Sequence, residues 1–166
     1  GNTKETTRKK VGLALSGGIA RGPVHVGVLA VLEREGIPID YVAGASAGAW
    51  VGAGYCAGLE IPKLRHLSTH TSWRDVVTFT LPTEGLISFA RLEALIESEI
   101  GCVDIRDLNI PFAAVVTDLD IGEQKILREG RLSTAVRASC SVPGFVTPVK
   151  MDDGHPHKHH PPEGTA

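Results

Sequence analysis

The sequence predicts a three-layer α/β fold with a mainly parallel central sheet. Short apolar runs that suit buried strands alternate with longer runs of helical periodicity, which is typical of βαβ units. The first such unit spans residues 11–43, and units of this kind join parallel strands by a right-handed crossover. A chain of 166 residues is long enough for one domain with a single sizeable core.

The first βαβ unit has recognisable boundaries. Residues 11–15 form a short apolar strand that ends at a Ser-Gly-Gly sequence. A helix is expected over residues 23–35, because Pro23 suits the first turn and Gly36 the C-terminal stop. Residues 39–43 are expected to form the second strand. The apolar stripe of the helix, at helical spacing, consists of Val24, Val28, Val31 and Leu32.

The later elements follow the same patterns. Further helices are expected over residues 47–59, 62–70, 91–100 and 132–138. Strands are expected over residues 111–116 and 124–127, joined as a hairpin around residues 120–122. The Thr- and Pro-rich residues 78–83 predict a loop.

Composition excludes several classes of protein. With 42% hydrophobic residues, 22% charged residues and a net charge of -2, the chain has no basic excess for binding nucleic acid. Its three cysteines lack metal-ligand spacing, which argues against a disulfide framework or a zinc site and favours a reducing compartment. No signal-peptide or membrane-spanning run is found, so a cytoplasmic protein is expected.

The folded domain is expected over residues 11–154. Residues 1–10 form a polar, basic tail before it, and residues 155–166 form a His- and Pro-rich tail without apolar periodicity, expected to be disordered. A metal site in the second tail is disfavoured, because its histidines lack carboxylate or cysteine partners. These histidines are His155, His157, His159 and His160.

Residues 44–48 match the pattern G-x-S-x-G between a predicted strand and a predicted helix. A sharp strand-to-helix turn would expose Ser46, and Gly44 and Gly48 would let the two backbones approach without Cβ clashes. The helix would also direct its positive N-terminus at the hydroxyl. Ser46 is therefore a candidate nucleophile; the alternative is a tight connection of small residues without chemistry.

A second glycine-rich turn, residues 17–22, follows the first strand. Its backbone N–H groups and the next helix N-terminus suit an oxyanion or a phosphate. Dinucleotide binding is disfavoured, because Ile19 replaces the middle glycine of G-x-G-x-x-G and Asp40 lies near the start of its strand. Adjacent parallel strands would instead bring this loop and Ser46 to one sheet edge, which favours an oxyanion hole.

Residues 13–59, LALSGGIARGPVHVGVLAVLEREGIPIDYVAGASAGAWVGAGYCAGL, resemble the opening of a patatin-like phospholipase domain. That family joins a G-G-G-x-R/K-G loop, a helix, a strand and a G-x-S-x-G elbow in this order. The similarity continues through residues 84–87, 107–112, 117–119, 122–123 and 138–149. The resemblance implies a serine acyl hydrolase acting on lipids and other esters through a Ser-Asp dyad, with no cofactor or metal.

The resemblance also implies roles for individual residues. Ser46 would be the nucleophile. Arg21, followed by Gly22, matches the basic loop residue that orders the loop or meets substrate charge, and Ile19 departs from the usual glycine. Membrane contact would be peripheral, through apolar loops near the site, and the oligomeric state is left open. The implied oxyanion hole consists of the backbone N–H groups of Gly17, Gly18 and Ile19.

The aspartate of the family's D-G-G or D-G-A motif has no clear counterpart. Asp153 and Gly154 fit an earlier turn of the family pattern, and a His- and Pro-rich segment stands where a further strand should follow. Three interpretations are open: truncation or a frameshift removed the aspartate, Asp153 itself is the dyad residue, or a tail histidine replaces it. The first is favoured, because the segment has no strand pattern.

Other polar and aromatic residues favour structural roles. His25 is expected to be a packed or capping histidine, and Asp118 occupies a structural position by the resemblance. Trp50 and Trp73 are expected to pack in or around the core. An α/β-hydrolase is disfavoured, because its serine usually follows several strands. The alternative to an enzyme is a catalytically inactive fragment, or a binding or regulatory module that lacks the dyad aspartate.

Overall fold

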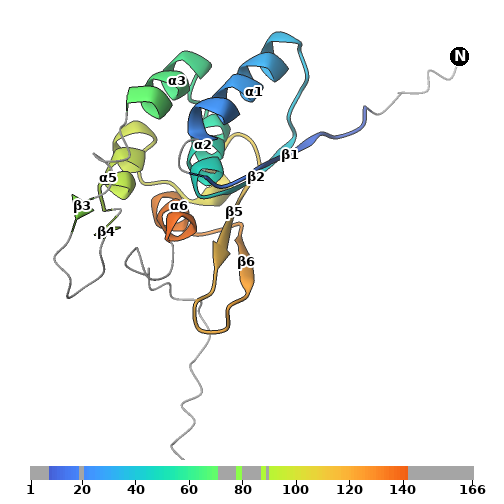
Figure 1. Ribbon diagram of the computed structural model, residues 1–166. Coiled ribbons are helices and arrows are strands. Elements are labelled where there is room, and N and C mark those ends of the chain that lie inside the picture. Colours follow the sequence, from blue (N-terminus) through green and yellow to red (C-terminus); the bar gives the residue numbers. More distant parts are fainter. Residues whose placement is uncertain (1–7, 19–20, 71–77, 80–86, 89, 142–166) are drawn as a thin grey trace, which may run out of the picture.

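The computed structural model describes residues 8–18, 21–70, 78–79, 87–88 and 90–141. A four-stranded sheet, with strand order β1-β2-β5-β6, forms the centre of this part of the chain (Figure 1). The first three strands run parallel, and the last is antiparallel to its neighbour. The predicted α/β class and mainly parallel sheet are confirmed, as is the hairpin. The strands are β1 (Gly12–Leu15), β2 (Tyr41–Ala45), β5 (Phe112–Thr117) and β6 (Gln124–Leu127).

Helices connect these strands and lie close to their predicted positions. One predicted loop differs: residues 78–83 begin with β3 (Thr78–Phe79), which pairs with β4 (Ile87–Ser88), while residues 80–83 lie outside the described ones. Composition alone does not reveal such a pairing between separate segments. The described helices are α1 (Gly22–Arg34), α2 (Ala47–Cys56), α3 (Ile61–His70), α5 (Ala90–Glu99), α6 (Leu132–Cys140) and the short 3-10 helix η2 (Ile105–Asp107).

Two element boundaries differ from the prediction for identifiable reasons. β2 was expected over residues 39–43 but spans Tyr41–Ala45, because Asp40 bonds to Val11 through both its backbone N–H and its carboxylate and the register with β1 begins only at the next residue. α2 ends before residue 59, because Gly58 adopts a φ of 95° and its N–H and that of the next residue bond back to the last turn. This is the Schellman arrangement that favours glycine.

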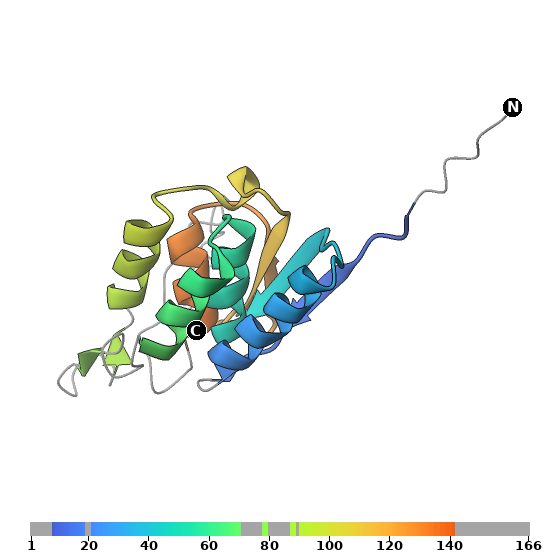
Figure 2. The same ribbon diagram turned by 90° about the horizontal axis from the view of Figure 1, so that it is seen from above.

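One face of the sheet is covered by helices. α2 and α6 pack directly on it, α1 and α3 pack on α2, and α5 packs on α6. Figure 2 shows the helices gathered on this side. The second helical layer expected from the sequence is not among the described residues. The buried strand side chains on this face include Leu15, Val42, Phe112, Ala114 and Val116.

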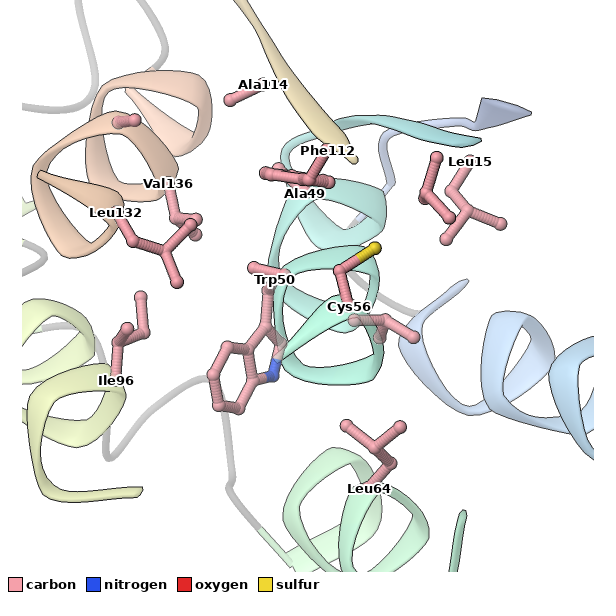
Figure 3. Packing of buried hydrophobic residues seen from close by; sticks show 14 of the residues in the cluster. Leu15, Ala49, Trp50, Cys56, Leu64, Ile96, Phe112, Ala114, Leu132 and Val136 are labelled. Carbon is pink, nitrogen blue, oxygen red and sulfur yellow. The ribbon is translucent and has the colours of Figure 1, made fainter. Parts of the chain in front are cut away.

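α2 is the centre of the hydrophobic core. Its small residues let the neighbours approach closely: a Cβ at Gly52 would lie 3.1 Å from the side chains of Val42 and Phe112. Trp50, 5% exposed, extends from α2 among side chains of the surrounding helices (Figure 3), so its predicted packing role is confirmed. Trp73 lies outside the described residues. No helix in the described ranges has the length and apolar character to cross a bilayer.

Most of the apolar stripe predicted for α1 lies outside the core, and only its fourth member, Leu32, is half-buried. Val24, Val28 and Val31 are 63%, 43% and 46% exposed, whereas Val26 and Leu29 on the other side are buried. The helix carries apolar residues on two faces, so periodicity alone does not identify the one that packs. Contacts with α2 and α3 decide the orientation.

Two valine substitutions test this orientation. Val26→Ala should lower the free energy of unfolding by about 2 kcal/mol, because it removes two methyl groups from the core. Val28→Ala should change it by less than about 0.5 kcal/mol, because that side chain is largely solvated. Both changes gain the same helix propensity, so their difference reports burial. Urea unfolding followed by tryptophan fluorescence measures both; equal losses would contradict the orientation.

Candidate active site

Ser46 lies at the turn between β2 and α2. Its φ is 52° and its ψ -116°, and no other non-glycine residue in the described part of the chain has a positive φ. Such a backbone costs about 1–3 kcal/mol and persists only where its surroundings enforce it. Ser46 is also the N-cap residue of α2, so it stands at the positive end of the helix dipole.

The two glycines of the elbow allow its sharp turn. A Cβ on Gly44 would lie 2.4 Å from the carbonyl oxygen of Gly48, and a Cβ on Gly48 would lie 2.2 Å from the carbonyl oxygen of Leu15. Real Cβ atoms essentially never approach backbone so closely. The start of α2 therefore packs against the ends of β1 and β2, and this contact requires glycine at both positions.

Ser139, on α6, anchors the elbow from the other side. Its hydroxyl accepts a hydrogen bond of 2.8 Å from the N–H of Ser46 and donates one of 2.5 Å to the carbonyl oxygen of Val115 in β5. The strained residue is thus tied to both a helix and a strand. Sequence reasoning assigned no role to Ser139; the signal was its place in residues 138–149, which resemble the family.

The glycine-rich loop lies beside Ser46. Parallel pairing of Leu15 with Gly44 brings the ends of β1 and β2 to one edge of the sheet, as predicted. A Cβ on Gly17 would lie 3.4 Å from the Cβ of Ser46, so the loop backbone passes beside the elbow. Gly18 adopts a φ of 130°, which L side chains rarely adopt. Ile19 lies outside the described residues.

Arg21 folds back on this loop. Its guanidinium donates to the carbonyl oxygen of Gly17 at 3.2 Å and to the hydroxyl of Ser16 at 3.3 Å. Its backbone N–H donates to the carbonyl oxygen of Gly18 at 2.9 Å. Of the two roles that the resemblance implies for this side chain, the contacts support ordering of the loop. Gly22 then begins α1 and is buried against α2 and α3.

His25, one turn further along α1, contacts the same loop. Its Nε2 lies 2.8 Å from the carbonyl oxygen of Ser16, and the residue is 9% exposed. The prediction of a packed histidine is therefore confirmed. Because a carbonyl oxygen only accepts, this ring nitrogen carries the proton and donates it.

Cys140, at the end of α6, is buried near Ser46. Burial raises the pKa of Cys140 to about 12. The thiol therefore stays protonated near neutral pH and does not compete as a thiolate nucleophile. Within the described ranges, Ser46 has no hydrogen bond with a carboxylate or an imidazole.

Two carboxylates near the ends of the strands, Asp118 and Asp40, have structural roles. Asp118 forms an ion pair of 2.8 Å with Lys125 and accepts from the N–H of Asp120, which holds the β5–β6 turn. Asp40 precedes β2 and so lies at the opposite end of the strand from Ser46. Its carboxylate accepts hydrogen bonds from Arg8 and from the backbone N–H of Val11, and these bonds, the one from Arg8 most, lower its pKa to about 2.

Two further features of the sequence, Asp153 and the tail histidines, lie outside the described residues. Among the residues that are described, no group of three or more His, Cys, Asp or Glu side chains could hold a metal ion.

The fold and the site define an α/β protein with a serine elbow beside a glycine loop. A family model described as patatin-like phospholipase matches residues 13–157, and the chain belongs to this family. It is 36% identical over 156 residues to the protein named neuropathy target esterase sws of Drosophila persimilis and to that of Drosophila virilis. These matches cover 90% of this chain, but 11% and 10% of the relatives, so the chain spans about a tenth of their length.

A matched pair of helical glycines tests the close contact at the elbow. Gly48→Ala should lower the free energy of unfolding by about 3 kcal/mol, because its Cβ would overlap the backbone of Leu15. Gly27→Ala in α1 meets nothing within 4 Å and should stabilise the protein by about 0.5–1 kcal/mol through helix propensity. Thermal unfolding measures both. Similar stability of the two variants would mean that the elbow does not need its glycine.

Proposed function

We propose that this chain is a serine acyl hydrolase that cleaves ester bonds of lipids, with Ser46 as its nucleophile. The observation that carries the proposal is the close approach of the Gly17 backbone to Ser46, which stands at a positive φ at the N-terminus of α2. A nucleophile, nearby backbone donors and a helix dipole are the parts that acyl transfer needs. Membership of the patatin-like phospholipase family supports the same reaction class.

The proposed reaction has two halves. The Ser46 oxygen attacks the ester carbonyl while a base takes its proton, and the carbonyl oxygen becomes an oxyanion that backbone N–H groups of Gly17 and Gly18 stabilise. The C–O bond to the leaving alcohol then breaks, the alcohol takes up the proton, and an acyl-enzyme remains. Water adds to that ester by the same route and releases the carboxylic acid and free Ser46.

The preference for lipid esters is supported by the names of the relatives and the family and by the surface near the site. Leu119 and Ile121 are 43% and 61% exposed. They follow the C-terminal end of β5. Because β5 runs parallel to β2, they lie at the same end of the sheet as Ser46, which follows the C-terminal end of β2. Exposed aliphatic side chains at this edge suit peripheral contact with a lipid surface.

Ser46→Ala tests the nucleophile directly. It should abolish labelling by a fluorophosphonate probe and lower the hydrolysis of a p-nitrophenyl ester by about 10⁴-fold or more, because no other group replaces the attacking oxygen. Ser98→Ala on the exposed face of α5 is the matched control and should behave like the parent chain. A folded parent that is labelled no better than Ser46→Ala would favour the alternative, a catalytically inactive binding module.

The proposed base is the aspartate of a Ser-Asp dyad, and Asp153 is its candidate in this chain. If Asp153 takes the proton from Ser46, Asp153→Asn should lower kcat by about 10³-fold or more, because an amide cannot act as a base. The neighbouring Asp152→Asn is the matched control and should keep parental kcat. Hydrolysis of a p-nitrophenyl ester measures both. Equal rates of the two variants would exclude Asp153 as the base.

A further inference from the structure

Three successive carbonyl groups of the glycine loop are held by α1. The carbonyl oxygen of Ser16 accepts a hydrogen bond of 2.8 Å from His25 Nε2. The carbonyl oxygen of Gly17 accepts one of 3.2 Å from the Arg21 guanidinium, and the carbonyl oxygen of Gly18 accepts one of 2.9 Å from the backbone N–H of Arg21. All three partners come from the first helical turn or its N-cap residue. The carbonyl side of the loop therefore faces α1.

This arrangement also directs the N–H groups of the loop. In a trans peptide the N–H points opposite to the preceding C=O, and the described residues contain no cis peptide. The N–H groups of Gly17 and Gly18 therefore point away from Arg21 and His25. Neither donates to a protein acceptor within the described ranges. Two N–H groups without an acceptor among the described residues thus lie in a loop whose backbone passes beside Ser46.

We propose that His25 is the positioning residue of the oxyanion hole. By holding the Ser16 carbonyl oxygen, it fixes the Ser16–Gly17 peptide plane and aims the Gly17 N–H at the oxyanion that forms next to Ser46. The inference rests on the proposed function, and it adds a role to a side chain that does not itself touch the substrate.

The loop needs such a holder because of its glycines. Gly17 has no side chain, which leaves its backbone beside Ser46 free to rotate. A rotation of the Ser16–Gly17 peptide would turn a carbonyl oxygen toward the oxyanion and repel it. The bond from His25, a nearly buried side chain on a regular helix, makes that rotation costly, because the carbonyl would lose its partner.

The histidine can perform this role in either protonation state. The neutral ring with its proton on Nε2 donates to the carbonyl, and the imidazolium donates from the same nitrogen. What the role requires is one N–H donor at the Nε2 position. Glutamine offers a comparable donor at the end of a side chain of similar reach, whereas leucine offers none.

The test compares His25→Leu and His25→Gln with the parent chain. In His25→Leu, kcat for a p-nitrophenyl ester should fall by about 100-fold while KM changes by less than about twofold, because the lost interaction belongs to the transition state. His25→Gln should restore kcat to within about fivefold of the parent. His66→Leu, which removes an exposed histidine from α3, is the control and should keep parental kcat.

Two results would overturn the proposal. One is parental kcat in a folded His25→Leu variant. The other is a His25→Gln variant that is folded and as slow as His25→Leu, since the ring would then act by packing alone. Unfolding midpoints establish that the variants are folded.

A second measurement separates this proposal from the proposed function. Residual dipolar couplings report the direction of the Gly17 N–H bond without any reaction. This direction should be the same in the parent and in His25→Gln, and different in His25→Leu. If the parent chain neither labels nor hydrolyses esters, the proposed function fails, and the couplings still decide the role of His25: an unchanged Gly17 direction in His25→Leu would overturn it.

Discussion

The packing of the first turn of α2 against the ends of β1 and β2 is the constraint on which the rest of the site depends. Gly48 approaches the Leu15 carbonyl and Gly44 approaches Gly48 at distances that leave no room for a Cβ. This contact forces the chain to turn within one residue, so Ser46 takes the positive φ. It also brings the end of β1, and with it Gly17, next to the serine. Ser46 and the glycine loop are therefore placed by one backbone contact.

The strained backbone of Ser46 is stabilised by hydrogen bonds and by the burial of the helix that follows it. Its N–H bonds to Ser139, its carbonyl oxygen accepts from the N–H of Trp50, and the helix that follows is almost completely buried. Each net hydrogen bond contributes about 1 kcal/mol, which is comparable with the roughly 1–3 kcal/mol that such a backbone costs. Burial of α2 in the core adds to this. The elbow is therefore a rigid part of the fold, as a preorganised site requires.

Local patterns predicted the parts of the site that are close in sequence. The order of strand, helix, strand and elbow turn follows from residue types and spacing over short stretches, and this order was predicted correctly, although β2 begins and ends two residues later than expected. The packed face of α1 was not, because two faces of that helix are apolar and only contacts with α2 and α3 choose between them. Ser139 was missed for a related reason: its partner Ser46 is 93 positions away, and no local pattern encodes such a bond.

The described residues divide the proposed chemistry into two parts. In the proposed reaction, Gly17, Gly18 and the residues that hold them would supply transition-state stabilisation, while the buried, protonated Cys140 would supply no base. Serine hydrolases that lose a member of their catalytic group keep about 10³–10⁴-fold acceleration from the oxyanion hole and binding alone. The loop would therefore lower the barrier by a similar factor independently of the base. Because His25 acts on this part only, the energetic effects of the loop and of the dyad aspartate are expected to be separable in this protein.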